Sequence, residues 1–263
     1  SRRGNGLEAD RFKGEGIIPA QDTANILIYG GINEKEEYLG SIQIVNLQTY
    51  SGQQTYKLPE DLDGIAYHRI VSTMELEAKK RVDKLIEVEI KKDGVYCFGG
   101  KNNNGQFLEG LKVLNLETNS NGELVPREWI KLKTEGVAPR PRVNHSMSLL
   151  PRLNSICIVG GYISTHNRQS DHNEVFRGIH ILNLLNLNWY QPQILLDEGL
   201  SKGLSGHCST VVGSKIYIFG GLRNDSRYST DLLEIETDQI RVQCSLIKPR
   251  KPSSARRSEQ RMI

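Results

Sequence analysis

The stretch Val95-Tyr96-Cys97-Phe98-Gly99-Gly100 decides the fold of this 263-residue chain, because the same arrangement occurs four times. Each copy is an apolar tetrapeptide followed by two glycines, and the other copies are residues 26–31 (ILIYGG), 156–161 (ICIVGG) and 216–221 (IYIFGG). The first glycines of the pairs, at positions 30, 99, 160 and 220, are 69, 61 and 60 residues apart. Such near-constant spacing indicates an internal structural repeat.

Further apolar segments accompany each glycine pair in a fixed order. A second segment lies downstream, at residues 42–47, 111–116, 179–184 and 232–235, and a third, often aromatic, follows at 56–58, 129–132 and 189–190. Another segment precedes the pair, led by histidine at residues 68–71, 145–150 and 207–212, with 16–19 as the candidate in the first unit. Short apolar or alternating segments without a helical period are typical of strands.

The glycine pairs themselves fit a strand that ends in a tight turn. A continuously apolar strand must be buried on both faces, and two glycines then allow a sharp exit and the close approach of a neighbouring unit. A unit of four short strands cannot bury both faces alone, but units packed around an axis can. We therefore predict an all-β propeller in which four four-stranded blades are visible.

This pattern resembles the kelch repeat, in which Pro-Arg-x-x-His precedes an apolar strand, a glycine pair and a later tryptophan. The third unit matches best, with Pro141-Arg142-Val143-Asn144-His145, Gly160-Gly161 and Trp189. The other units match in part, with His68, Gly99-Gly100 and Trp129 in the second, His207 and Gly220-Gly221 in the fourth, and Gly30-Gly31 and Tyr56 in the first. The resemblance implies a β-propeller and is nearly silent about function.

The resemblance divides the chain into three parts. Residues 1–15 are a polar N-terminal segment, 16–246 form the blades, and 247–263 are a basic tail that we expect to be disordered or to act as a linker. Kelch propellers usually have five to seven blades, whereas four are visible here. We therefore expect the four blades to be part of a larger ring or of one that a partner completes, because an open propeller exposes a strand edge that pairs with other chains.

Several segments exceed the basic repeat. Between His68 and Val95 lie 26 residues, whose alternating segments flank a charged turn at 79–84, and this predicts a hairpin projecting from the second blade. Other long loops are expected at residues 102–110, 119–127 and 164–176.

Composition limits the classes of function. The net charge of +3 argues against nucleic acid as the main partner, and no apolar stretch is long enough to span a membrane. The four cysteines form no C-x-x-C pair, so a reducing compartment such as the cytoplasm fits best. No P-loop, dinucleotide fingerprint or nucleophile elbow is present, so we expect no cofactor and no small-molecule substrate.

An enzymatic alternative would need a metal. The known kelch enzymes of this kind are the copper enzymes of the galactose oxidase type and the iron-dependent kelch proteins. The only candidate metal ligands in this chain are His166 and His172, near Arg168 and Asp171. The histidines at 68, 145 and 207 recur once per blade, which predicts a packing role with their imidazoles hydrogen-bonded to neighbouring backbone. We therefore predict a non-catalytic protein, with a metal-dependent kelch enzyme as the alternative.

The predicted function is a protein–protein interaction scaffold that binds through loop tips, an open blade edge and the basic tail. The bias toward Asn, Lys and Ile is typical of AT-rich protist genomes and favours a cytoskeletal or ciliary scaffold. A substrate receptor of a ubiquitin ligase is the alternative. The predicted partner-binding residues are Asn102, Asn103, Asn104, His166, Arg168, His172, Arg223, Arg227, Lys248, Arg250, Lys251, Arg256 and Arg257.

Overall fold

The computed structural model describes residues 14–20, 23–47, 54–59, 63–74, 92–167, 170–238 and 240–248. Strands form nearly all the regular structure of these residues, joined by two short 3-10 helices, η2 (Pro151–Leu153) and η3 (Leu200–Lys202). Within the same residues, no helix has the length and apolar character needed to cross a membrane. The chain is an all-β protein, as the repeats predict.

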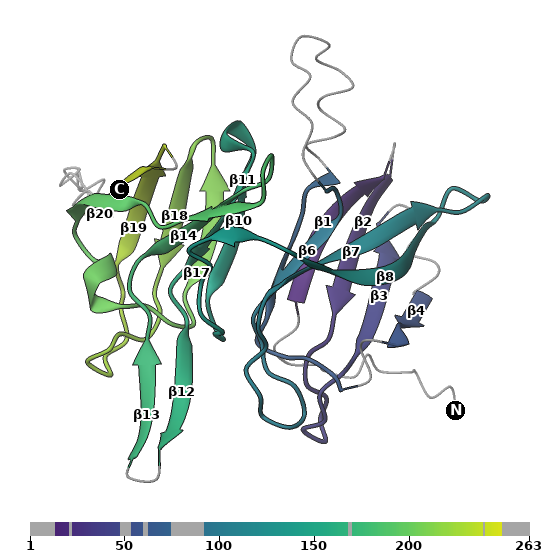
Figure 1. Cartoon of the computed structure of the whole chain (residues 1–263), viewed down its shortest axis with the longest axis horizontal. Coiled ribbons are helices and arrows are strands. Elements are labelled where there is room, and N and C mark those ends of the chain that lie inside the picture. Colours follow the sequence, from purple (N-terminus) through teal and green to yellow (C-terminus); the bar gives the residue numbers. More distant parts are fainter. Residues whose placement is uncertain are drawn as a thin grey trace, which may run out of the picture.

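The first two blades are four-stranded antiparallel sheets in sequence order (Figure 1). Blade 1 consists of β1 (Gly14–Ala20), β2 (Thr23–Tyr29), β3 (Ser41–Asn46) and β4 (Gln54–Lys57). Blade 2 consists of β5 (Arg69–Ser72), β6 (Val95–Phe98), β7 (Leu111–Thr118) and β8 (Leu124–Leu132). The opening strand proposed for the first unit is thus confirmed, and it begins at Gly14.

The third and fourth blades each gain a fifth strand from the segment that enters them. Blade 3 contains β9 (Glu135–Gly136), β10 (Ser146–Leu150), β11 (Ser155–Val159), β14 (Ile179–Asn183) and β15 (Asn188–Tyr190). Blade 4 contains β16 (Gln193–Asp197), β17 (Cys208–Val212), β18 (Lys215–Phe219), β19 (Leu232–Thr237) and β20 (Arg241–Ile247). The entering strands β9 and β16 run parallel to β15 and β20 respectively.

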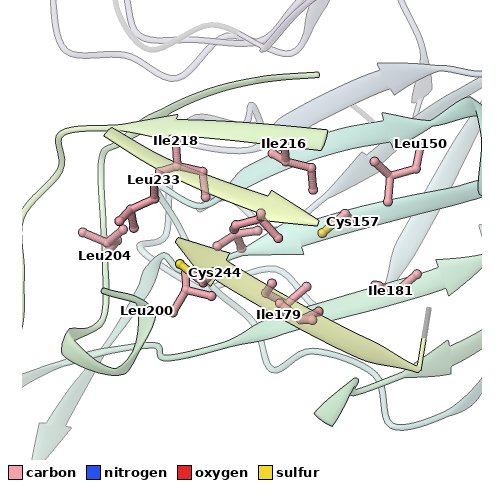
Figure 2. Packing of buried hydrophobic residues seen from close by; sticks show 13 residues of the cluster. Leu150, Cys157, Ile179, Ile181, Leu200, Leu204, Ile216, Ile218, Leu233 and Cys244 are labelled. Carbon is pink, nitrogen blue, oxygen red and sulfur yellow. The ribbon is translucent and has the colours of Figure 1, made fainter. Parts of the chain in front are cut away.

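Three apolar cores lie between consecutive blades. The first joins blades 1 and 2 around Tyr29 and Trp129, and the second joins blades 2 and 3 around Phe98 and Trp189. Figure 2 shows the third, in which side chains of blade 3 such as Ile181 gather with those of blade 4 such as Ile216. The innermost strands β1, β5, β10 and β17 are consecutive neighbours. In the described part of the chain, no apolar core joins blade 4 to blade 1.

Some predicted loops are in fact strands. Residues 164–176 belong mainly to a hairpin of β12 (Tyr162–Asn167) and β13 (Ser170–Val175), which projects from the third blade in Figure 1. Residues 119–127 lie at the end of the extended β7–β8 hairpin. Both segments form strands where loops were predicted for the same reason, because long insertions between paired strands can continue as antiparallel hairpins. The hairpin predicted in the second blade, with strands at residues 71–76 and 85–90, falls almost wholly on residues 75–91, which lie outside the described residues.

Candidate partner-binding surfaces

A contact that uses the glycine pair repeats between neighbouring blades. The second glycine donates its backbone N–H to a carbonyl three residues before the histidine of the next blade, in the pairs Gly31–Ile65 (2.8 Å), Gly100–Arg142 (3.0 Å) and Gly161–Leu204 (2.8 Å). A β-carbon on the first glycine would overlap the same carbonyl oxygen and approach the imidazole of the next blade, at His68, His145 or His207. Glycine is therefore required at these positions because two backbones meet there.

The recurring histidines complete these contacts. His68 packs edge-on against Tyr29 with 5.0 Å between ring centroids, and His145 packs in the same way against Phe98 at 5.6 Å. Burial lowers the pKa of His68 to about 3 and that of His207 to about 4, so both imidazoles are neutral. The predicted packing role is confirmed.

The hydrogen bonds of the histidines agree only in part with those expected, because His68 interacts with the backbone of Tyr29, whereas His207 and His145 have no backbone partner among the described residues. His207 Nε2 lies 2.9 Å from the hydroxyl of Ser146, a side chain rather than a backbone group. The buried ring nitrogens of His145 have no hydrogen-bond partner among the described residues. His145 therefore contributes through shape and ring packing alone.

The loops that follow the glycine pairs form a second surface, here called the loop face (residues 31–40, 100–110, 161–178 and 221–231). Hydrogen bonds join neighbouring loops, because Asn103 Oδ1 accepts from the N–H of Tyr38 at 3.1 Å and Asn224 Nδ2 donates to the carbonyl of Val175 at 3.4 Å. Tyr38 also packs edge-on against Tyr67 with 6.3 Å between centroids. These bonds link the first loop to the second and the fourth loop to the third.

The three predicted asparagines have different positions on the loop face. Asn102 is buried, and its Oδ1 accepts the N–H groups of Asn104 (3.1 Å) and Gln106 (3.0 Å). Its side chain therefore shapes the turn, and its predicted contact with a partner stays a prediction. Asn103 and Asn104 are exposed, and Asn104 has no cross-blade bond among the described residues.

The two predicted arginines of the fourth blade also differ. The guanidinium of Arg223 is mostly buried, donates to the hydroxyl of Ser229 at 3.0 Å and forms an ion pair with Asp231. Arg223 therefore stabilises its own loop, and its predicted part in partner binding stays a prediction. Arg227 is exposed at the tip of the same loop.

The remaining predicted residues lie partly outside the described chain. The β12–β13 register pairs His166 with Asp171 and His172 with Thr165, so the two histidines are not cross-strand partners of each other. Lys248 is exposed after β20. Arg168, Arg250, Lys251, Arg256 and Arg257 lie outside the described residues.

The described residues also bear on the metal alternative. They contain no group of three or more His, Cys, Asp or Glu side chains that could hold a metal ion.

Sequence reasoning missed two exposed aromatic residues of blade 4. Phe219, which precedes the last glycine pair, is 57% exposed, and Tyr228 on the loop face is 83% exposed. The sequence carries no signal for the exposure of Phe219, because Tyr217 and Phe219 repeat the spacing of Tyr96 and Phe98, which are buried.

No protein-family model matches the chain. Host cell factor 2 of Homo sapiens is 26% identical over 212 residues, which are 74% of this chain and 24% of that protein. The Rab9 effector protein with kelch motifs of Danio rerio is 25% identical over 220 residues, which are 82% of this chain and 52% of that protein. Tip elongation aberrant protein 1 of Schizosaccharomyces pombe is 28% identical over 146 residues, which are 56% of this chain and 11% of that protein.

The chain spans about half the length of the Danio rerio protein and a smaller share of the other two. The zebrafish relative carries kelch motifs in its name, and its similarity extends over most of the four blades. The relatives that match are kelch-repeat proteins, and the repeated glycine pairs and all-β blades of this chain are those of a kelch-type propeller fold.

Proposed function

We propose that the chain is a non-catalytic scaffold that binds other proteins through its loop face. The observation that carries this proposal is that hydrogen bonds join the loops of neighbouring blades. Asn103 ties the second loop to the first, and Asn224 ties the fourth loop to the third. Loops on a rigid scaffold that are already ordered lose little conformational entropy when a partner binds.

Turn geometry adds to this preorganisation. Asn33 Oδ1 accepts the N–H groups of Lys35 at 3.0 Å and Glu37 at 2.9 Å, and Asn102 makes the equivalent pair of bonds in the second loop. The exposed tips therefore present polar and charged side chains in fixed positions. Such a surface suits recognition of a polar protein surface more than catalysis.

We further propose a cytoskeletal setting for this scaffold. The Schizosaccharomyces pombe relative is named for aberrant tip elongation, which supports a role in cell shape. A tagged chain purified from its native cells would then carry tubulin, actin-associated or ciliary proteins. Cullins and ubiquitin components in their place would favour the ligase-receptor alternative.

The test of the loop face is a double substitution at exposed tips, N104R with R227E. Neither side chain has a cross-blade bond among the described residues, so the fold should be unchanged and partner recovery should fall at least about tenfold. R152E is the matched control, because Arg152 is exposed in η2 at the opposite end of the blade. Equal recovery with the double variant and the control would refute this surface.

A further inference from the structure

Three side chains occupy equivalent positions on the innermost strands of blades 2, 3 and 4. Arg69, Ser146 and Cys208 each directly follow the histidine of their blade, and each pairs with the residue before a glycine pair. The strands that carry them, β5, β10 and β17, are consecutive neighbours. Arginine at the first position departs from the small side chains of the other two. The inner-strand site is defined here as Arg69, Ser146, Cys208 and the histidines His68, His145 and His207.

The guanidinium of Arg69 lies within electrostatic reach of all three blades of this site. Burial, and then the charge of Arg69, lower the pKa of each of the three histidines. Burial also lowers the pKa of Arg69 itself, and Cys208 on β17 opposes that shift. The side chain of Arg69 therefore extends from blade 2 towards blade 4.

Few protein groups accept from the five N–H donors of this guanidinium. Among the described residues, its one hydrogen bond runs from Nη1 to the carbonyl of His68, at 3.0 Å. No carboxylate of the described chain forms an ion pair with it. Arg69 is half-buried, so its remaining donors are open to a ligand.

Arg142 shows how the fold satisfies an arginine that it holds for structure alone. This fully buried side chain donates to the carbonyls of Arg140 (3.0 Å) and Gly160 (2.9 Å). Its guanidinium also lies 4.0 Å from the centroid of the Phe176 ring. Within the described residues, Arg69 has neither a second carbonyl acceptor nor an aromatic ring. The donors that Arg142 commits to the protein are left over at Arg69.

The charged groups around the inner-strand site are all cations. Lys112 and Arg142 join Arg69 in lowering the pKa of its histidines, and no carboxylate of the described chain acts on them. The imidazoles are neutral, so they add no charge of their own. An uncompensated cation in a partly enclosed site is screened less than one at an open surface, and it therefore attracts anions.

We propose that the inner-strand site binds a small oxyanion, a phosphate or carboxylate group, through a bidentate contact with the guanidinium of Arg69. The planar fork of an arginine matches two oxygens of such a group. The Ser146 hydroxyl, which lies 2.9 Å from His207 Nε2, and the Cys208 thiol are the neighbouring groups that bound the ligand. This inference goes beyond the loop-face function, and neither depends on the other. The oxyanion is either a free ion or the acidic side chain of a protein partner, and the experiments separate these sources.

The first experiment follows the side chain of Arg69 by NMR while inorganic phosphate is added to the full chain at constant ionic strength. We expect the Arg69 Nε–H signal to shift until it saturates. The exposed Arg152 in η2 is the internal control, whose signal should show no saturable shift. The absence of a saturable shift at Arg69 overturns the proposal, and so does an equal shift at Arg152.

The second experiment uses the thiol of Cys208 as a reporter. Cys208 is exposed and the other three cysteines are buried, so iodoacetamide should label Cys208 in the folded chain. Saturating phosphate should slow this labelling at least about threefold in the unmodified chain and in the control variant R152M, and should not slow it in R69M. Equal protection in R69M and R152M would be a general effect of salt and overturns the proposal.

The variant R69K keeps the proposal testable if R69M fails to fold. Its ammonium group retains the charge without the planar fork, so the affinity for phosphate should fall at least about tenfold. The NMR signal of the Cys208 amide reports this affinity in both proteins. An unchanged affinity in R69K would mean that no bidentate contact holds the ion, and it overturns the proposal.

Recovery of protein partners from native cells separates the two sources of the oxyanion. Loss of recovery in R69M, together with release of the partner by added phosphate, assigns the oxyanion to an acidic side chain of the partner. Unchanged recovery in R69M, which no longer binds phosphate, assigns it to a free ion. N104R/R227E should bind phosphate like the unmodified chain, so failure of the loop face is distinguishable from failure of this site.

Discussion

The blade 2–blade 3 interface and the outward face of blade 4 have nearly the same local sequence and opposite surroundings. Both strands read Tyr-x-Phe-Gly-Gly, yet Phe98 is 2% and Phe219 57% exposed. Strand pairing is also the same, because Phe98 pairs with Leu111 and Phe219 with Leu232. The difference shows that the local sequence determines the strand pairing within a blade, whereas contact with the next blade determines whether the aromatic side chain is buried.

The largest expected effect tests this contrast directly. F98A removes a buried ring that contacts both His145 and Trp189, and should lower the free energy of unfolding by about 3–5 kcal/mol. F219A removes an exposed ring and should change it by less than about 1 kcal/mol. Urea unfolding of the two variants measures both values. Similar losses would mean that a partner already covers Phe219 in solution.

The glycine pair gives a second, smaller contrast. G99A places a β-carbon against the Arg142 carbonyl and adds left-handed strain, so a loss of about 2–4 kcal/mol is expected. G220A has the same backbone conformation without the neighbour, and should lose only about 1–2 kcal/mol of strain energy.

Thermal unfolding of both proteins, with the melting temperature as readout, checks this order. An equal loss in the two variants would show that backbone strain alone requires glycine, and that the close approach of the next blade contributes little.

The blades could be predicted from sequence because their signal is local. An apolar strand followed by two glycines needs only its own residues to be recognised, and its four copies predict the repeat. The strands β9 and β16 could not be predicted in this way. Strand β9 pairs in parallel with β15, and β16 pairs in parallel with β20, in each case the outer strand of the blade that the segment enters. This pairing depends on the path of the connecting segment between two blades and not on the residue types within that segment.

The bonding of the candidate surface residues within their own loops could not be predicted, for a related reason. Asn102 and Arg223 belong to residue types common at exposed contacts, but hydrogen bonds to Gln106 and Asp231 commit them to their own loops. Whether a side chain forms hydrogen bonds within its own loop depends on the geometry of the turn. The exposure of Phe219 depends on the absence of a neighbour, which no pattern within the four repeats encodes.

The smallest expected effect concerns pH and the buried histidines of the blade contacts. The pKa of His207 is lowered to about 4 by burial, whereas an unfolded histidine takes up its proton near pH 6.5. The unfolded state thus binds more protons below pH 6.5, so stability is full above that pH and falls as the pH drops toward 4. At pH 5 the loss from one such histidine is about 2 kcal/mol.

Urea unfolding at pH 7 and pH 5 measures this loss, and H207Q isolates the share of His207. The variant can be less stable at both pH values because it removes the contact with Ser146. Its difference between the two pH values should nevertheless be smaller by about 2 kcal/mol than that of the unmodified chain. An unchanged difference would show that other groups carry the pH dependence, and that the His207 imidazole is not held neutral by its place between blades.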